Sequence, residues 1–140
     1  MKKIIALSGK SNVGKTQTLK LLIDKLDKVG VCKHKEVKEF NDIKRTYKYK
    51  ETIISICTAG DAAYIIESNI EYFKNHNCDI AITAVRTKGK TQLVLNSFAK
   101  ELGLKVDYIS KVIDKDNAQQ VNEKFADDLL DMIDDTIKTS

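Results

Sequence analysis

A glycine-containing octapeptide near the start of the chain is the feature that most constrains its fold. This segment, Gly9-Lys10-Ser11-Asn12-Val13-Gly14-Lys15-Thr16, lies between a short apolar run at residues 3–8 and an amphipathic segment at residues 15–28. A short apolar run is typical of a buried strand, whereas leucine and isoleucine at 3.6-residue spacing are typical of a helix. Because glycine tolerates backbone conformations closed to other residues, the octapeptide can turn sharply between the two. The chain is therefore predicted to begin with a strand, a tight turn and a helix.

The remainder of the chain alternates between the same two kinds of segment. Strands are expected at residues 43–49, 52–57, 79–85 and 105–112, and helices at residues 62–76, 91–102 and 117–138. Strands that alternate with helices of this length form a mostly parallel sheet covered on both faces, here an α/β/α sandwich of about five strands. The alternating lysines of 43–49 indicate an additional strand at an edge of the sheet. With 140 residues and no linker, we expect one domain spanning 1–140.

The glycine turn has the composition of a phosphate-binding loop. Gly9 and Gly14 allow the main chain to approach an anion closely, and the following helix adds the partial positive charge of its amino end. Lys15 is expected to face solvent until it reaches the β- and γ-phosphates of a nucleotide, and the Thr16 hydroxyl is expected to bind Mg²⁺. Ligands of such sheets bind beyond the carboxyl ends of the strands, which is where this turn lies.

The octapeptide resembles the Walker A motif, GxxxxGK[ST], of the P-loop NTPase superfamily at every defined position. The resemblance implies a P-loop NTPase-like fold and the binding of a nucleoside triphosphate with Mg²⁺. The residues that it implies for nucleotide binding are Gly9, Lys10, Ser11, Asn12, Val13, Gly14, Lys15, Thr16 and Gln17. The motif itself covers eight residues, and the order of strands and helices extends the likeness along the domain.

Lys10 adds a resemblance to one branch of that superfamily. It stands five residues before Lys15, the spacing of the signature lysine of the deviant Walker A ATPases, which reaches the nucleotide of the partner across a dimer. That family usually has Lys-Gly-Gly, whereas Ser11 and Asn12 follow Lys10 here. A homodimer and an exposed loop lysine are both consistent with this pattern.

The segment Ile53–Asp61 is similar to the hhhhDTAG switch segment of GTPases, except that Cys57 stands in the place of the aspartate. The expected edge strand at 43–49 is placed like the antiparallel second strand of those proteins, so the resemblance implies that it is antiparallel. Because a thiol is a poor ligand for Mg²⁺, ordinary GTPase chemistry is not expected. Asp61, at the turn from strand to helix, is predicted to replace that aspartate as a metal-associated carboxylate or general base. Its structural alternative is a helix N-cap.

Arg86 follows the third buried strand, in the basic segment 85–90. Guanine-specific proteins of the superfamily carry Asn-Lys-x-Asp at this strand end, and the sequence lacks it, so ATP is expected rather than GTP. Arg86 is predicted to neutralise charge on a transferred phosphoryl group. A basic loop of solvated side chains is the alternative.

The charge of the chain is uneven, because residues 1–50 hold 14 Lys/Arg against 5 Asp/Glu. Such an excess can attract nucleic acid. Only Arg45 and Arg86 are arginines, however, and arginine supplies most bidentate phosphate and guanine contacts, so a lysine-rich solvated surface is favoured.

Apolar runs and cysteine spacing bear on the surroundings of the protein. No apolar run approaches the roughly 20 residues of a membrane span, and no secretory signal is evident, so a cytoplasmic protein without a membrane partner is expected. Cys32, Cys57 and Cys78 form no CxxC pattern, which argues against disulfides and zinc. His34 and His76 lack metal-ligand spacing and are expected at loops or element ends.

These patterns together predict an ATP-binding P-loop protein, either a Mg²⁺-dependent NTPase or a nucleotide-gated switch. Lys15, Asp61 and Arg86 are the expected catalytic residues, and Thr16 and Asp61 are the expected Mg²⁺ ligands. A small-molecule or nucleotide kinase is the alternative, and a nucleic-acid-associated module is a third.

Overall fold

Six strands lie side by side in one mixed sheet in the computed structural model, which describes residues 1–10, 14–37, 42–111 and 116–139. The strands are β1 (Lys3–Ser8), β2 (Val31–Val37), β3 (Ile43–Tyr49), β4 (Thr52–Cys57), β5 (Ile80–Val85) and β6 (Val106–Ser110), in the spatial order β2-β3-β4-β5-β1-β6. The pairs β1·β5, β1·β6 and β4·β5 are parallel. Strand β3 runs antiparallel to both of its neighbours, β2 and β4.

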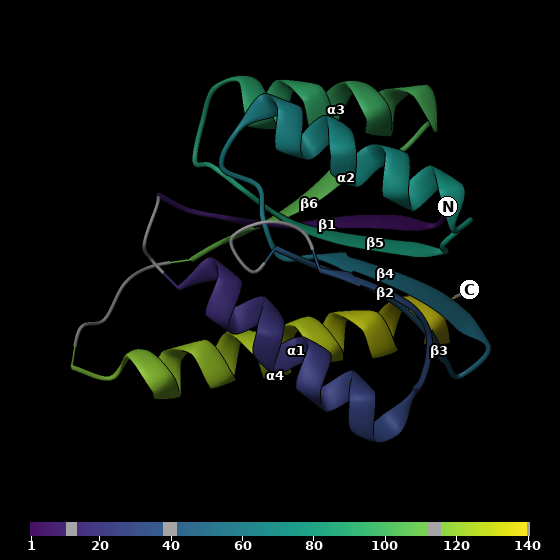
Figure 1. Cartoon of the computed structure of the whole chain (residues 1–140), viewed down its shortest axis with the longest axis vertical. Coiled ribbons are helices and arrows are strands. Elements are labelled where there is room, and N and C mark those ends of the chain that lie inside the picture. Colours follow the sequence, from purple (N-terminus) through teal and green to yellow (C-terminus); the bar gives the residue numbers. More distant parts are fainter. Residues whose placement is uncertain (11–13, 38–41, 112–115, 140) are drawn as a thin grey trace.

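Four helices cover the two faces of this sheet in the described chain, as Figure 1 shows. Helices α1 (Lys15–Val29) and α4 (Ala118–Lys138) pack together on one face, and α2 (Ala63–Asn75) and α3 (Lys90–Glu101) pack together on the other. Each face has its own apolar core, one built on Leu19, Leu22 and Leu129 and the other on Ile66, Phe73 and Leu95. The predicted three-layer α/β/α arrangement is therefore confirmed. None of these helices is both long enough and apolar enough to cross a lipid bilayer, among the residues described.

The edge of the sheet differs from the prediction. The sequence pattern predicts no strand at residues 31–37, whereas the structure places β2 there, at the edge next to β3. The segment Val-Cys-Lys-His-Lys-Glu-Val carries no run of apolar residues, because an edge strand with an exposed face contributes little to the core. The expected edge role of 43–49 is wrong, since β3 is second from the edge and its Lys44 side chain is only 4% exposed.

The carboxyl ends of the central strands lie together, at the edge of the sheet where a ligand site is expected. All six residues of β5 are buried, as are five of the six residues of β1, because helices cover both sides of these strands. Strands β1, β4 and β5 are mutually parallel through their pairings and end at Ser8, Cys57 and Val85. The segments that follow these three ends therefore meet at one edge of the sheet, beside the start of α1.

Candidate functional site

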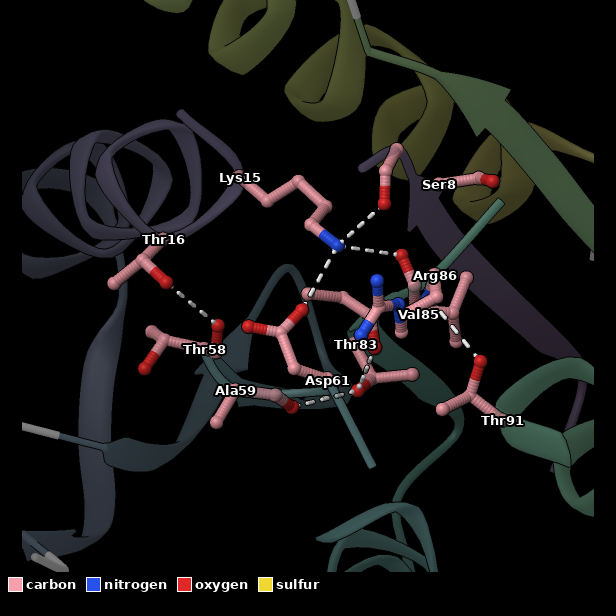
Figure 2. A network of polar contacts seen from close by, with 12 residues as sticks. Ser8, Lys15, Thr16, Thr58, Ala59, Asp61, Thr83, Val85, Arg86 and Thr91 are labelled. Atoms are coloured by element: carbon pink, nitrogen blue, oxygen red, sulfur yellow. Dashed lines mark hydrogen bonds and ion pairs between the residues drawn. The ribbon is translucent and has the colours of Figure 1, made fainter. Parts of the chain in front are cut away.

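The amino group of Lys15 is the centre of a polar network at the carboxyl ends of β1 and β5 (Figure 2). Its Nζ donates hydrogen bonds to the carbonyl oxygens of Gly9, at 2.7 Å, and of Val85, at 2.8 Å. It also lies 3.1 Å from a carboxylate oxygen of Asp61. Lys15 is 5% exposed, so the expectation that its side chain faces solvent is wrong.

The start of α1 has the properties of an anion-binding end. Its N-cap residue, Gly14, makes no side-chain capping bond, and its first turn contains no acidic residue. The first helical residue is instead Lys15, whose positive charge adds to the positive end of the helix dipole. Both features favour a negatively charged ligand over a neutral one at this point.

Position 14 requires glycine because of its backbone conformation and because of a close neighbour on α4. It has φ 86°, in the left-handed region that favours glycine. A β-carbon at this position would lie 2.8 Å from the side-chain oxygen of Asn122. Asn122 is buried and accepts a hydrogen bond from Thr18, at 3.2 Å, so α4 supports the first turn of α1 directly.

Asp61 lies in the turn between β4 and α2 and contacts Lys15 rather than capping the helix. The N-cap of α2 is Ala62, which makes no side-chain capping bond, so the alternative role of Asp61 as a helix N-cap is wrong. Its side chain remains 55% exposed while paired with Lys15. The carboxylate is therefore both oriented by the protein and open to a ligand.

Two threonines connect α1 to the neighbouring strands. The Thr16 hydroxyl donates to the carbonyl oxygen of Thr58 at 3.3 Å (Figure 2). The Thr58 hydroxyl in turn accepts a hydrogen bond from the main-chain N–H of Ile43, at 2.9 Å, and the Thr58 N–H donates to the Ile43 carbonyl. The segment after β4 is thus fixed between the helix and β3.

Two buried polar residues that sequence analysis did not single out hold the same segment from the other side. The Asn69 amide on α2 donates to the carbonyl oxygen of Ala59, at 2.8 Å, and to the hydroxyl of Thr83, at 2.9 Å. Asn69 is 1% exposed and Thr83 is not exposed. A polar side chain in the middle of the apolar run 80–85 was the available signal for Thr83.

Two cavities adjoin this network. The smaller, about 340 Å³, is lined by Gly14, Lys15, Thr16, Gln17, Thr58, Gly60, Asp61 and Ala84. The larger, about 630 Å³, shares Thr16, Thr58 and Asp61 with it and extends toward β3 and α2. Its additional walls include Asp42, Lys44 and Tyr64. Both volumes are in the range of small-molecule sites.

Asp42, just before β3, is a second carboxylate of the larger cavity that sequence analysis missed. Burial raises its pKa above the ordinary value, the charge of Asp61 raises it further, and Lys44 lowers it. The charge of Asp61 thus acts on Asp42, and both residues line the same cavity as Thr16. Carboxylate and hydroxyl oxygens are the donors that Mg²⁺ prefers, so these residues fit that ion.

Cys57 has no place in this donor set. It is 1% exposed at the end of β4, and burial raises the pKa of its thiol far above the ordinary value. The thiol therefore stays protonated and apolar in character.

Of the other predicted residues, Gln17 lines the smaller cavity, whereas Lys10 and Arg86 line neither cavity. Gly9 is buried and donates its N–H to the Val85 carbonyl at 3.2 Å, whereas Lys10 and Gln17 are exposed. Arg86 is exposed, and the Thr91 hydroxyl accepts a hydrogen bond from its main-chain N–H (Figure 2). Ser11, Asn12 and Val13 lie outside the described residues.

Comparison of the chain with models of known protein families, with curated proteins and with solved structures finds no match. We therefore infer the function from the residues and geometry of the site.

Proposed function

We propose that this protein binds ATP with Mg²⁺ at the amino end of α1 and hydrolyses it as a P-loop NTPase. The observation that carries the proposal is the position of Lys15, a buried ammonium group at the start of a helix, held by oxygens from the ends of two parallel strands and by Asp61. We propose ATP rather than GTP because the sequence lacks Asn-Lys-x-Asp.

The charge balance of the smaller cavity supports an anionic ligand. A buried ammonium group and the positive end of α1 face only one carboxylate among the residues that line it. A polyphosphate offers several charged oxygens, which can accept hydrogen bonds from Lys15 and from the main-chain N–H groups at the start of the helix. Lys15 and Gly14 would hold the phosphates in this proposal.

Mg²⁺ fits the oxygen donors around the same cavities. Thr16, Asp61 and Asp42 would hold the ion directly or through water. When bound, Mg²⁺ neutralises negative charge on the phosphate oxygens. Asp61 would orient the attacking water, and the exposed Arg86 would add positive charge from the segment after β5.

The same contacts provide a route by which bound nucleotide can change the surface. A phosphate that takes the hydrogen bonds of Lys15 competes with Asp61 for the ammonium group. Asp61 belongs to the segment that Thr16 and Asn69 hold at Thr58 and Ala59. The segment 58–61 would therefore respond to the nucleotide, as a nucleotide-gated switch requires.

A phosphotransferase is the second candidate, and the larger cavity favours it. This cavity of about 630 Å³ opens beside Thr16 and Asp61, where an acceptor molecule would lie next to the terminal phosphate. Asp42 and Lys44 in its wall could bind a polar acceptor. A kinase would release phosphate from ATP slowly without its acceptor, whereas an NTPase needs none.

A ligand panel tests the proposed function. Thermal shift and calorimetric titration compare ATP, ADP and GTP with and without Mg²⁺, and phosphate release measures turnover. At roughly 100 times the dissociation constant, a ligand stabilises the protein by about 2.7 kcal/mol. We expect MgATP to bind wild type and Lys28→Ala, a substitution at the far end of α1, but not Lys15→Ala. Equal binding of ATP by all three proteins would contradict the proposal.

A further inference from the structure

A second cluster of chemically reactive side chains lies at the β2 edge, outside the two cavities described above. It consists of His34 and Glu36 on β2 and His76 at the end of α2. One ligand atom from each residue lies within 4.8 Å of the others. The Nε2 atom of His34 is 3.0 Å from a carboxylate oxygen of Glu36, and the two imidazole rings are 4.4 Å apart between centroids.

The register of the sheet brings these residues to one face. His34 is opposite Thr46 on β3, whose hydroxyl is hydrogen-bonded to Tyr72 of α2. The strand therefore directs His34, and two residues later Glu36, toward the helix that ends at His76. An irregularity in the pairing separates Cys32 from His34. Cys32 is opposite Tyr47, whose hydroxyl contacts Asp27 on α1, at the other face of the sheet.

We propose that His34, Glu36 and His76 bind Zn²⁺. Two imidazoles and one carboxylate are a common protein ligand set for this ion, with a fourth position left for water. Bonds of about 2.0–2.2 Å place tetrahedral ligand atoms roughly 3.4 Å apart. All three side chains are partly exposed, so small rotations about their side-chain bonds can bring their ligand atoms to this spacing.

The surroundings of His76 favour a neutral and restrained imidazole ring. Burial and the neighbouring His34 both lower the pKa of His76, so its imidazole is neutral at physiological pH, while Glu36 opposes this shift. The Tyr72 ring packs against the His76 ring at a tilt of 39°, with centroids 4.3 Å apart, which restrains the imidazole. The nearby cation Lys44 lies over the Tyr72 ring and donates to Ser68, so that residue is engaged elsewhere.

This site differs from the proposed Mg²⁺ site in both chemistry and place. Imidazole nitrogen suits Zn²⁺, whereas the donors around Thr16 and Asp61 are oxygens. None of the three proposed zinc ligands lines either of the two cavities. Bound Zn²⁺ would join the edge strand β2 to α2 and should slow hydrogen exchange of the β2 amides.

The chain contains only two histidines, which allows a direct test on the wild-type protein. Tag-free full-length protein is titrated with Zn²⁺ in excess Mg²⁺, and calorimetry is combined with NMR of the imidazole nitrogens. We expect one Zn²⁺ per chain and simultaneous shifts of both imidazole signals. His34→Gln and His76→Gln should each weaken binding by at least the roughly 10–100-fold that loss of an outer partner of a metal site costs. Glu36→Gln should also weaken it.

Matched controls separate this proposal from its alternatives. Cys32→Ser tests an exposed thiol on the same strand, and Asp61→Asn tests the nucleotide site; both should bind Zn²⁺ as wild type does. Zn²⁺ that shifts neither imidazole signal, or that binds equally well to both histidine variants, would overturn the proposal. Loss of binding in Cys32→Ser alone would assign the metal to the thiol. Because the imidazole signals are measured in wild type, misfolding of a variant leaves the test decisive.

Discussion

A β-carbon at Gly60 would lie 1.7 Å from the carbonyl oxygen of Ala84. The turn after β4 therefore rests on the main chain at the end of β5, with no room for a side chain between them. This contact places Asp61 beside Val85. The Lys15 amino group donates a hydrogen bond to the Val85 carbonyl and also pairs with the Asp61 carboxylate. A single close approach of two backbones thus brings the carboxylate to the lysine.

Gly60→Ala should disturb both stability and the site. The new methyl group meets backbone atoms that cannot rotate away, and overpacking of this kind costs about 1–3 kcal/mol or more. Gly103→Ala is the control, because Gly103 has φ 72° but open space around it, and its cost is only about 1–2 kcal/mol of backbone strain. Urea unfolding measures both. A Gly60→Ala variant as stable as wild type would contradict the close contact at Gly60.

Lys15→Ala should lower stability as well as nucleotide binding. Without the ammonium group, the Gly9 carbonyl loses a buried hydrogen-bond donor, at a cost of about 1–3 kcal/mol. Lys28→Ala, at an exposed position of the same helix, should change the free energy of unfolding by about 0.5 kcal/mol or less. A Lys15→Ala variant as stable as Lys28→Ala would mean that the buried contacts contribute nothing.

Asp61→Asn should reduce turnover with little effect on stability. An ion pair to a half-exposed carboxylate contributes at most about 1 kcal/mol, whereas loss of a group that orients the attacking water costs about 100-fold or more in rate. Asp127→Asn removes a comparably exposed carboxylate, paired with Lys25 on the surface, and serves as the control. Phosphate release at saturating MgATP measures the difference. Unchanged turnover in Asp61→Asn would exclude it from catalysis.

His76 should make the folded protein sensitive to acid. Its pKa is lowered in the folded state from the ordinary value of 6.5, so the unfolded chain binds more protons as the pH falls through that value. The free energy of unfolding should therefore decrease below about pH 6.5 and lose this contribution in His76→Gln. Unfolding curves at about pH 8 and pH 5, recorded with a chelator, give the comparison. An identical pH dependence in the two proteins would contradict it.

Lys10→Ala tests the dimer that the spacing to Lys15 indicates. Lys10 is exposed beside the end of β1, so its removal should not affect folding. If Lys10 reaches the nucleotide of a partner, wild type should elute as a dimer with MgATP, and Lys10→Ala should remain monomeric while still binding the nucleotide. Identical elution of wild type with and without MgATP would exclude the dimer.

The main elements of the fold could be predicted because their residues repeat with a clear period. The boundaries of β1, β3 and β4 agree with the predicted 3–8, 43–49 and 52–57. Strand β2 could not be found in this way, because its hydrogen bonds to β3 involve main-chain atoms and its side chains are largely polar. The position of β3 inside the sheet depended on that missing neighbour.

The candidate site was predictable only where one segment carries the signal. The octapeptide indicates Gly9, Lys15 and Thr16, and the end of the next strand but one indicates Asp61, but the contacts of Lys15 with Asp61 and Val85 depend on how the sheet brings these segments together. Asp42 belongs to the site only because β3 folds beside β4, and nothing in its local sequence distinguishes it. The approach of His34 to His76 depends likewise on β2, so spacing along the chain could not reveal it.

Among the described residues, three oxygens surround the Lys15 amino group, and two of them belong to the main chain, at Gly9 and Val85. A substitution changes the side chain but keeps the peptide carbonyl. Substitutions at residues 9 or 85 therefore leave these two acceptors in place as long as the strands keep their register. Asp61 is the one acceptor of the three that a point mutation can remove. A substitution around Lys15 can therefore remove only the negative charge of Asp61. The two carbonyl acceptors persist for as long as the sheet keeps its fold.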